Sequence, residues 1–111
     1  MDDCLFCRIV AGKIPATVVY EDEHVVAIND VFPRAPFHVL VVPRQHIERL
    51  SDLDDEALGG RLLQAARRVA RQGGVGDNFR LVVNNGDHAG QTVWHLHFHV
   101  LGGRDFAWPP G

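Results

Sequence analysis

The sequence lacks an apolar run of the length that a membrane-spanning helix needs. The apolar stretch from Val39 to Val42 is far shorter and is typical of a buried strand. The first three residues, Met1-Asp2-Asp3, are acidic at the end where a secretory signal peptide carries basic residues. These absences favour a cytoplasmic protein that is not bound to a membrane.

An excess of positive charge is also missing. Eleven Lys and Arg residues stand against 14 Asp and Glu, which gives a formal net charge of -3. Proteins that bind nucleic acid generally, through its phosphate backbone, usually carry a basic surface. We therefore expect no nucleic-acid partner. A small phosphorylated ligand is still compatible with this charge, because a few well-placed donors can bind phosphate on an acidic protein.

Cysteine is scarce, and the only two, Cys4 and Cys7, form one Cys-x-x-Cys motif. Two cysteines cannot build a disulfide framework, and in a reducing compartment this spacing favours metal or redox chemistry. No βαβ pattern precedes the motif, which argues against a thioredoxin-like site. Two free buried cysteines are the other alternative.

The chain has 111 residues and shows no repeat, linker or low-complexity tract, so we expect one domain over residues 1–111. Apolar periodicity predicts helices over residues 4–11 and from Ser51 to about Arg71, with Gly12 ending the first. β-Branched residues and turn signals predict strands over 17–20, 25–29, 38–42, 79–84 and 93–101. The predicted fold class is α+β, with an antiparallel sheet of about five strands and the longer helix on one face.

Three histidines alternate with apolar residues in the last predicted strand. Side chains alternate between the two faces of a strand, so His95, His97 and His99 should line one face. Trp94, Leu96, Phe98 and Val100 should line the other face as core. A histidine can serve as ligand, acid, base or nucleophile near neutral pH. A single metal held by all three histidines, which would activate water, and a merely solvated face are the alternatives.

A polar, glycine-containing loop precedes these histidines. Gly90 allows close approach of a ligand or a positive φ angle, and Gln91 and Thr92 offer donors suited to phosphate oxygens. His24 and His88 lie outside these motifs, and we expect them to be solvated surface residues.

The sequence resembles the histidine triad (HIT) superfamily over nearly its whole length, and within it the histidine triad nucleotide-binding (Hint) branch. Members of that branch are typically homodimers that bind purine nucleoside monophosphates. They hydrolyse phosphoramidates such as adenosine 5′-phosphoramidate through a covalent nucleotidyl–histidine intermediate. The resemblance is carried by His95-x-His97-x-His99, Phe6-Cys7-Arg8-Ile9, Ile14-Pro15, Tyr20-Glu21-Asp22, Pro36-Phe37-His38, Val42-Pro43, Leu101-Gly102-Gly103-Arg104 and Trp108-Pro109-Pro110-Gly111.

The resemblance also implies roles for individual residues. His97 matches the nucleophile, His99 a phosphate-binding histidine, and His38 a histidine beside the active site. Asp30 matches the carboxylate that holds the ribose hydroxyls. The positions that match phosphate contacts are Asn84, Gln91 and Thr92, and Gly90 beside them is a further nucleotide-binding candidate. Those that match the apolar slot for the base are Leu5, Phe6, Ile9, Ile28 and Val31.

Bacterial relatives with the Cys-x-x-Cys motif resemble structural zinc proteins, which implies Zn²⁺ bound by Cys4, Cys7, His46 and His95. If His95 belongs to such a site, His97 and His99 stay free for covalent catalysis. A dinucleoside polyphosphate hydrolase is the nearest enzymatic alternative. A nucleotide-binding regulatory module with incidental turnover is the alternative from another class.

Overall fold

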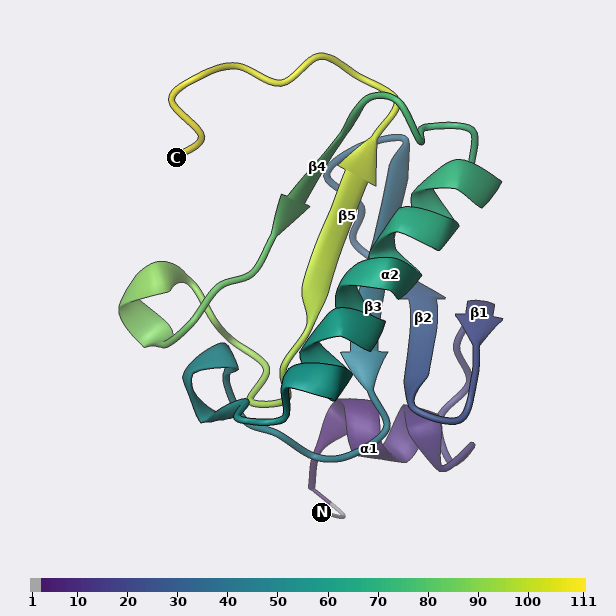
Figure 1. Cartoon of the computed structure of the whole chain (residues 1–111), viewed down its shortest axis with the longest axis vertical. Coiled ribbons are helices and arrows are strands. Elements are labelled where there is room, and N and C mark those ends of the chain that lie inside the picture. The colour runs from purple at the N-terminus through teal and green to yellow at the C-terminus, as the bar shows by residue number, and fades with distance from the viewer. Residues whose placement is uncertain (1–2) are drawn as a thin grey trace.

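The computed structural model describes residues 3–111 as five strands and two α-helices, an α+β fold (Figure 1). The strands are β1 (Val18–Glu21), β2 (Val25–Asn29), β3 (Phe37–Pro43), β4 (Phe79–Val82) and β5 (Phe98–Gly102). They form one antiparallel sheet in the order β1-β2-β3-β5-β4, which confirms the predicted fold class. Strand β3 lies in the middle and is buried from His38 onward, which suits its run of β-branched residues.

The long helix α2 (Glu56–Gln72) covers one face of the sheet and contacts β1, β2, β3 and β5 (Figure 1). Its buried stripe of Leu58, Leu62, Ala65, Ala66 and Val69 packs against the strand valines, as its periodicity predicts. Within residues 3–111 no helix has the length and apolar character needed to cross a membrane.

The predicted start of this helix is wrong. Ser51 belongs to a separate 3-10 helix (Leu50–Asp52), and its N–H donates to Asn85 Oδ1 at 2.8 Å. The cap of α2 is Asp55, whose Oδ1 accepts the N–H of Leu58 at 3.1 Å. Both residues are good capping types, but Leu53 is extended and separates the 3-10 helix of Ser51 from α2.

The short helix α1 (Leu5–Val10) lies at one end of the molecule and packs through Phe6 against the face of the sheet opposite to α2. Cys4 caps it, since its Sγ accepts the N–H of Cys7 at 3.3 Å. Gly12, with φ of 76°, follows the helix as predicted. Residues Phe6, Val26, Ile28, Leu40 and Val42 form the small core on this face.

The histidine segment is a strand only in its second half. Strand β5 begins at Phe98, whereas His95 lies in a bend and His97 precedes the ladder. The N–H of Leu96 donates to the carbonyl oxygen of Ile47 at 2.6 Å, so the backbone there follows a loop and not the sheet. Leu96, Phe98 and Val100 are buried as predicted, but Trp94 is 42% exposed and does not belong to the core.

Candidate functional site

His97 is buried and held in one tautomer. Its Nδ1 lies 2.8 Å from the backbone carbonyl oxygen of His95, which can only accept a hydrogen bond. Nδ1 therefore carries the proton. In the neutral ring the lone pair is then on Nε2, the atom that can attack an electrophile.

The tautomers of His38 and His99 are fixed by the same reasoning. The backbone N–H of Arg34 donates to Nδ1 of His38 at 3.0 Å, so a neutral His38 carries its proton on Nε2. That Nε2–H faces Nδ1 of His99 at 2.9 Å. His99 therefore accepts through Nδ1 and keeps its own proton on Nε2, where it can donate to an anionic ligand.

Burial keeps these rings neutral. Burial is the main cause that lowers the pKa of His38 and of His97 below the ordinary 6.5. Burial, followed by the positive charge that His97 or His38 would carry, lowers the pKa of His99 to about 4. At neutral pH the three rings are therefore uncharged, as a nucleophilic imidazole must be.

Asp30 completes this group of side chains. Its Oδ2 lies 3.3 Å from Nε2 of His38, and its Oδ1 accepts the N–H of Phe32 at 2.8 Å. Asp30, His38 and His99 could in principle share a metal ion, since their ligand atoms lie within 4.8 Å of one another. The donor set does not fit, because the Arg34 amide keeps the proton on the His38 nitrogen that would have to bind the metal.

The residues predicted for the base slot are only partly brought together. Phe6 and Ile28 are buried in the small core, and Ile9 packs against them. The Phe6 ring meets the His97 ring edge to face, with centroids 5.1 Å apart. The side chain of Leu5 is 44% exposed and that of Val31 is 81% exposed. Both are therefore accessible to a ligand and do not belong to the core.

The loop before the histidines is braced by Gln91. This side chain is buried, and its Oε1 accepts the N–H of Gly86 at 2.9 Å. Its Nε2 donates to the carbonyl oxygens of Glu48 at 2.7 Å and Val93 at 3.1 Å. The side chain of Gln91 thus supports the loop through three backbone contacts. Asn84 is half-buried, Thr92 is exposed, and Gly90 has φ of 96°, which only glycine adopts easily.

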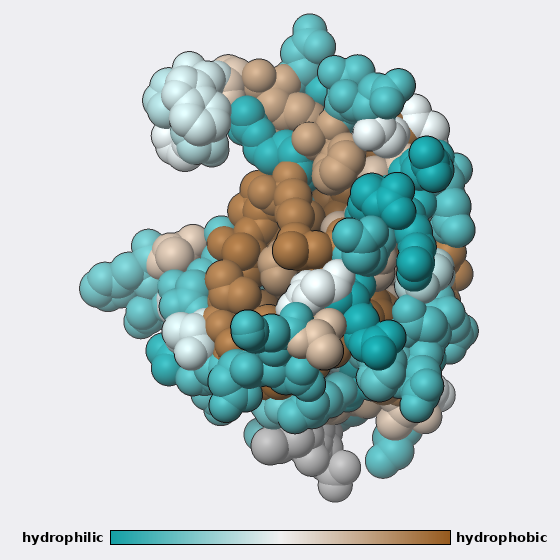
Figure 2. Space-filling view, viewed as in Figure 1, coloured by the Kyte–Doolittle hydropathy of each residue, from teal (hydrophilic) through white to brown (hydrophobic). Residues whose placement is uncertain are grey.

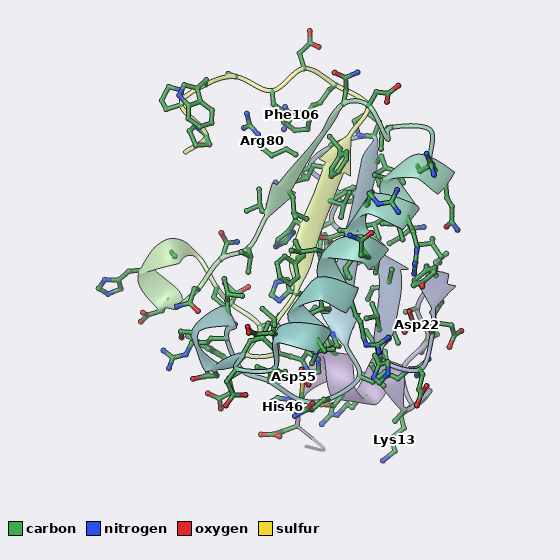
Figure 3. All side chains as sticks on the ribbon, in the orientation of Figure 1. Lys13, Asp22, His46, Asp55, Arg80 and Phe106 are labelled. Carbon is green, nitrogen blue, oxygen red and sulfur yellow. The ribbon has the colours of Figure 1, made fainter. Side chains whose placement is uncertain are left out.

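The cysteines meet two histidines in the Cys/His cluster, which we define as Cys4, Cys7, His46 and His95. Nδ1 of His95 lies 3.3 Å from Sγ of Cys4 and 3.5 Å from Sγ of Cys7. Nδ1 of His46 lies 3.2 Å from Sγ of Cys7. Figure 3 shows His46 at the end of the molecule where α1 lies.

The cluster is positioned to hold a metal ion. Tetrahedral coordination with Zn–S of about 2.3 Å and Zn–N of about 2.0 Å separates sulfur and nitrogen by about 3.5 Å, close to the distances found here. Nε2 of His95 lies 2.8 Å from the carbonyl oxygen of Pro43, so its proton is on Nε2 and its Nδ1 lone pair faces the thiols. Burial, followed by the Cys4 thiol, raises the pKa of Cys7 to about 11, which a bound cation would reverse.

His95 has two roles that its position in the sequence does not separate. Its ring belongs to the Cys/His cluster, while its carbonyl oxygen holds the proton of His97. Among residues 3–111 no metal-capable group joins His95, His97 and His99, so the alternative of one metal on all three is not supported. A cavity of about 390 Å³ lies beside the cluster and is lined in part by Cys4, His46 and Thr92.

Several groups that organise the site could not be recognised in the sequence. The Arg34 amide and the carbonyl oxygens of Pro43 and His95 fix the histidine tautomers, but they are backbone atoms that carry no residue signal. The bracing role of Gln91 had a signal in its position within the loop, which we interpreted as a phosphate contact.

Comparison with known proteins gives consistent matches. Residues 11–106 match the HIT domain family. An uncharacterized HIT-like protein of Synechocystis is 52% identical, with 99% of this chain and 98% of that protein covered. The crystal structure of a HIT family hydrolase from Legionella pneumophila is 44% identical, with a TM-score of 0.95 and coverage of 98% of this chain and 100% of that one. A histidine triad protein from Clostridium difficile is 40% identical, with a TM-score of 0.91 and 96% of each chain covered.

Proposed function

The chain belongs to the HIT domain family, and we propose that it hydrolyses purine nucleoside phosphoramidates through a covalent intermediate on His97. The observation that carries this proposal is the tautomer of His97, whose Nδ1–H is bound to a carbonyl oxygen and whose Nε2 is left as a neutral nucleophile. Similarity to HIT family hydrolases supports the hydrolase class. The bond cleaved, P–N, is our proposal.

In this mechanism Nε2 of His97 attacks the α-phosphorus of the substrate. A nitrogen–phosphorus bond forms, the P–N bond to the amine breaks, and the amine leaves after gaining a proton from solvent. The imidazole becomes cationic, and its Nδ1–H shares that charge with the His95 carbonyl oxygen at 2.8 Å. Water then attacks the phosphorus and the bond between the phosphorus and Nε2 of His97 breaks, which returns the imidazole to its neutral form. The nucleoside monophosphate departs, and a proton of that water passes to solvent.

His99 acts on the phosphate in this proposal. Its Nε2–H donates to a non-bridging oxygen, which gains negative charge in the transition state. His38 holds His99 in that tautomer through the contact of 2.9 Å. Asn84, Gly90, Gln91 and Thr92 would contribute phosphate contacts through side chains or backbone, with Gln91 bracing the loop that presents them.

The nucleoside would lie between the two exposed apolar residues and Asp30. Asp30 would accept the ribose hydroxyls, since its carboxylate has lone pairs beyond those used by Phe32 and His38. The base would meet Leu5 and Val31, with Phe6, Ile9 and Ile28 behind them.

The test is steady-state hydrolysis of adenosine 5′-phosphoramidate by wild type, His97→Ala and His88→Ala. His88 is an exposed histidine and serves as the matched control. We expect a loss on the order of a thousandfold or more in turnover for His97→Ala alone. Equal turnover in all three proteins would refute covalent catalysis. Faster cleavage of dinucleoside polyphosphates than of adenosine 5′-phosphoramidate would favour a dinucleoside polyphosphate hydrolase. AMP binding without turnover would favour a nucleotide-binding regulatory module.

We also propose that the Cys/His cluster binds structural Zn²⁺. Two thiolates and two neutral imidazoles make a neutral complex with Zn²⁺, which suits a partly buried site. The bound ion would fix α1 and His95 relative to the sheet. Elemental analysis should find about one zinc per chain, lost in Cys4→Ser. Zinc-free protein purified without chelator would contradict this assignment.

A homodimer is the third part of the proposal. Strand β4 is an edge of the sheet, and Figure 2 shows hydrophobic surface on the β4 and β5 side of the molecule. Leu81 on β4 is 37% exposed and Leu63 on α2 is 51% exposed. A Cβ atom at Gly60 would meet nothing within 4 Å, so no contact within the chain explains that glycine. A monomer in sedimentation at micromolar concentration would contradict the dimer.

A further inference from the structure

A polar groove of about 970 Å³ lies at the C-terminal end of α2, away from α1. Three segments form it: the last two turns of α2, the glycine-rich turn before β4, and the residues that follow β5. The side chains in its lining that carry charge are Arg67, Arg71 and Arg104, with Asp77 and Asp105. None of these residues belongs to the histidine site or to the Cys/His cluster.

The charge of this groove is unusual for the chain. Three arginines gather here in a protein whose formal net charge is -3. Among residues 3–111, none of the three has an ion pair with a carboxylate within 4.0 Å. Together with Asp77 and Asp105 the lining carries an excess of one positive charge, which favours an anionic ligand.

Two of the guanidinium groups are already oriented by the fold. Nε of Arg104 donates to the carbonyl oxygen of Arg34 at 3.1 Å, and its Nη1 donates to that of Asp105 at 3.0 Å. The Arg104 guanidinium also stacks on the ring of Phe106 at 4.2 Å. Nε of Arg67 donates to Oε1 of Gln64 at 3.0 Å. The remaining N–H groups keep the fork geometry that matches phosphate.

Figure 3 places Phe106 and Arg80 at the end of the molecule opposite to His46. Arg80 on β4 also contacts the segment that follows Arg104. Its guanidinium lies 5.0 Å from the Phe106 ring centroid, and its Nη2 donates to the carbonyl oxygen of Ala107 at 2.9 Å. The segment that carries Arg104 is therefore fixed to the sheet and does not depend on the groove for its position.

Two glycines allow the segments that line the groove to pack closely against their neighbours. A Cβ atom at Gly76 would lie 3.1 Å from Cα of Arg71, so the turn folds closely against the end of α2. Gly103 has φ of 86°, and its Cβ would lie 3.0 Å from Cβ of Pro36. Two of the three segments that line the groove therefore need glycine where they pack against their neighbours.

We propose that this groove is a second ligand site, which binds a small phosphate ester through Arg67, Arg71 and Arg104. The phosphate would meet the guanidinium groups, and Asp77 and Asp105 would accept hydrogen bonds from hydroxyl groups on the organic part. The site is independent of the proposed histidine chemistry.

The test is a titration of the ¹⁵N-labelled full chain with inorganic pyrophosphate at low ionic strength, followed by two-dimensional NMR. We expect saturable shifts of the amide signals of Gly74, Gly76 and Gly103. Signals around His97 and His99 report the histidine site separately, so failure at one site is distinguishable from failure at the other.

Arg71→Ala is the variant and Arg61→Ala is the matched control, since both are exposed arginines of α2 and only Arg71 lines the groove. We expect at least fivefold weaker binding at the groove for Arg71→Ala and an unchanged affinity for Arg61→Ala. Arg104 is left intact because it supports Arg34, whose amide orients His38. The spectrum of each variant also shows whether it has folded.

Shifts confined to the histidine site would overturn the proposal. So would shifts at the groove that never saturate, or that weaken equally in Arg71→Ala and Arg61→Ala, because these indicate general charge attraction. The absence of any shift at Gly74, Gly76 and Gly103 would overturn it as well.

Discussion

Acid should destabilise this protein through His99, and the size of the effect follows from the structure. Burial lowers the pKa of His99 from 6.5 to about 4. Between pH 6.5 and 4, His99 is therefore protonated in the unfolded chain and neutral in the folded chain. The contribution is complete above pH 6.5 and is lost as the pH falls from 6.5 towards 4.

At pH 5 the full shift corresponds to about 2 kcal/mol of lost unfolding free energy. The ring is partly exposed, and screening by water reduces this to about 1 kcal/mol. Replacement of His99 by Gln removes the titrating group while its Oε1 can still accept the Nε2–H of His38. The variant should therefore lose about 1 kcal/mol less than wild type between pH 7.5 and pH 5.

The assay is urea unfolding at both pH values for wild type, His99→Gln and His88→Gln. The exposed His88 provides the control, which should keep the wild-type pH dependence. Comparison between proteins cancels the protons taken up by the Cys/His cluster. An identical loss of stability in wild type and His99→Gln would refute the reasoning that burial of neutral His99 has an energetic cost in acid.

Three further predictions concern the metal, the small core and the helix cap. Removal of metal with a chelator should lower the melting temperature of the protein. It should also lower turnover, because the ring of His95 belongs to the Cys/His cluster and its carbonyl oxygen orients His97. Unchanged turnover in the metal-free protein would show that the two sites are independent. Phe6→Ala should cost about 3–5 kcal/mol in urea unfolding, because the ring is 4% exposed; a loss below about 1 kcal/mol would contradict its place in the core. Asp55→Ala should cost about 1 kcal/mol and the neighbouring Asp54→Ala little, and equal losses would contradict the assignment of the cap.

The sequence predicted those parts of the fold that depend on local pattern. The stripe of Leu58 and Leu62 marked the buried face of α2, and Gly12 marked the end of α1. The start of α2 was wrong because Ser51 and Asp55 are equally good caps in isolation. In the structure the backbone of Ser51 is held by Asn85, which is far away in the chain, and the carboxylate of Asp55 accepts the cap bond.

The same limit applies to the candidate site. Alternation placed His95, His97 and His99 on one strand, whereas His95 turns into a bend where its ring meets the cysteines. The four members of the Cys/His cluster were predicted from the resemblance, and the structure brings them together. The groove lined by Arg67, Arg71 and Arg104 could not be predicted from the sequence. These arginines come from two separate segments that lie together only in the folded protein.

The most direct test of the central claim is the intact mass of the protein after brief mixing with adenosine 5′-phosphoramidate. The account predicts an acid-labile adenylate adduct on wild type and none on His97→Ala. Product formed equally by both proteins, with no adduct on either, would contradict covalent catalysis by His97.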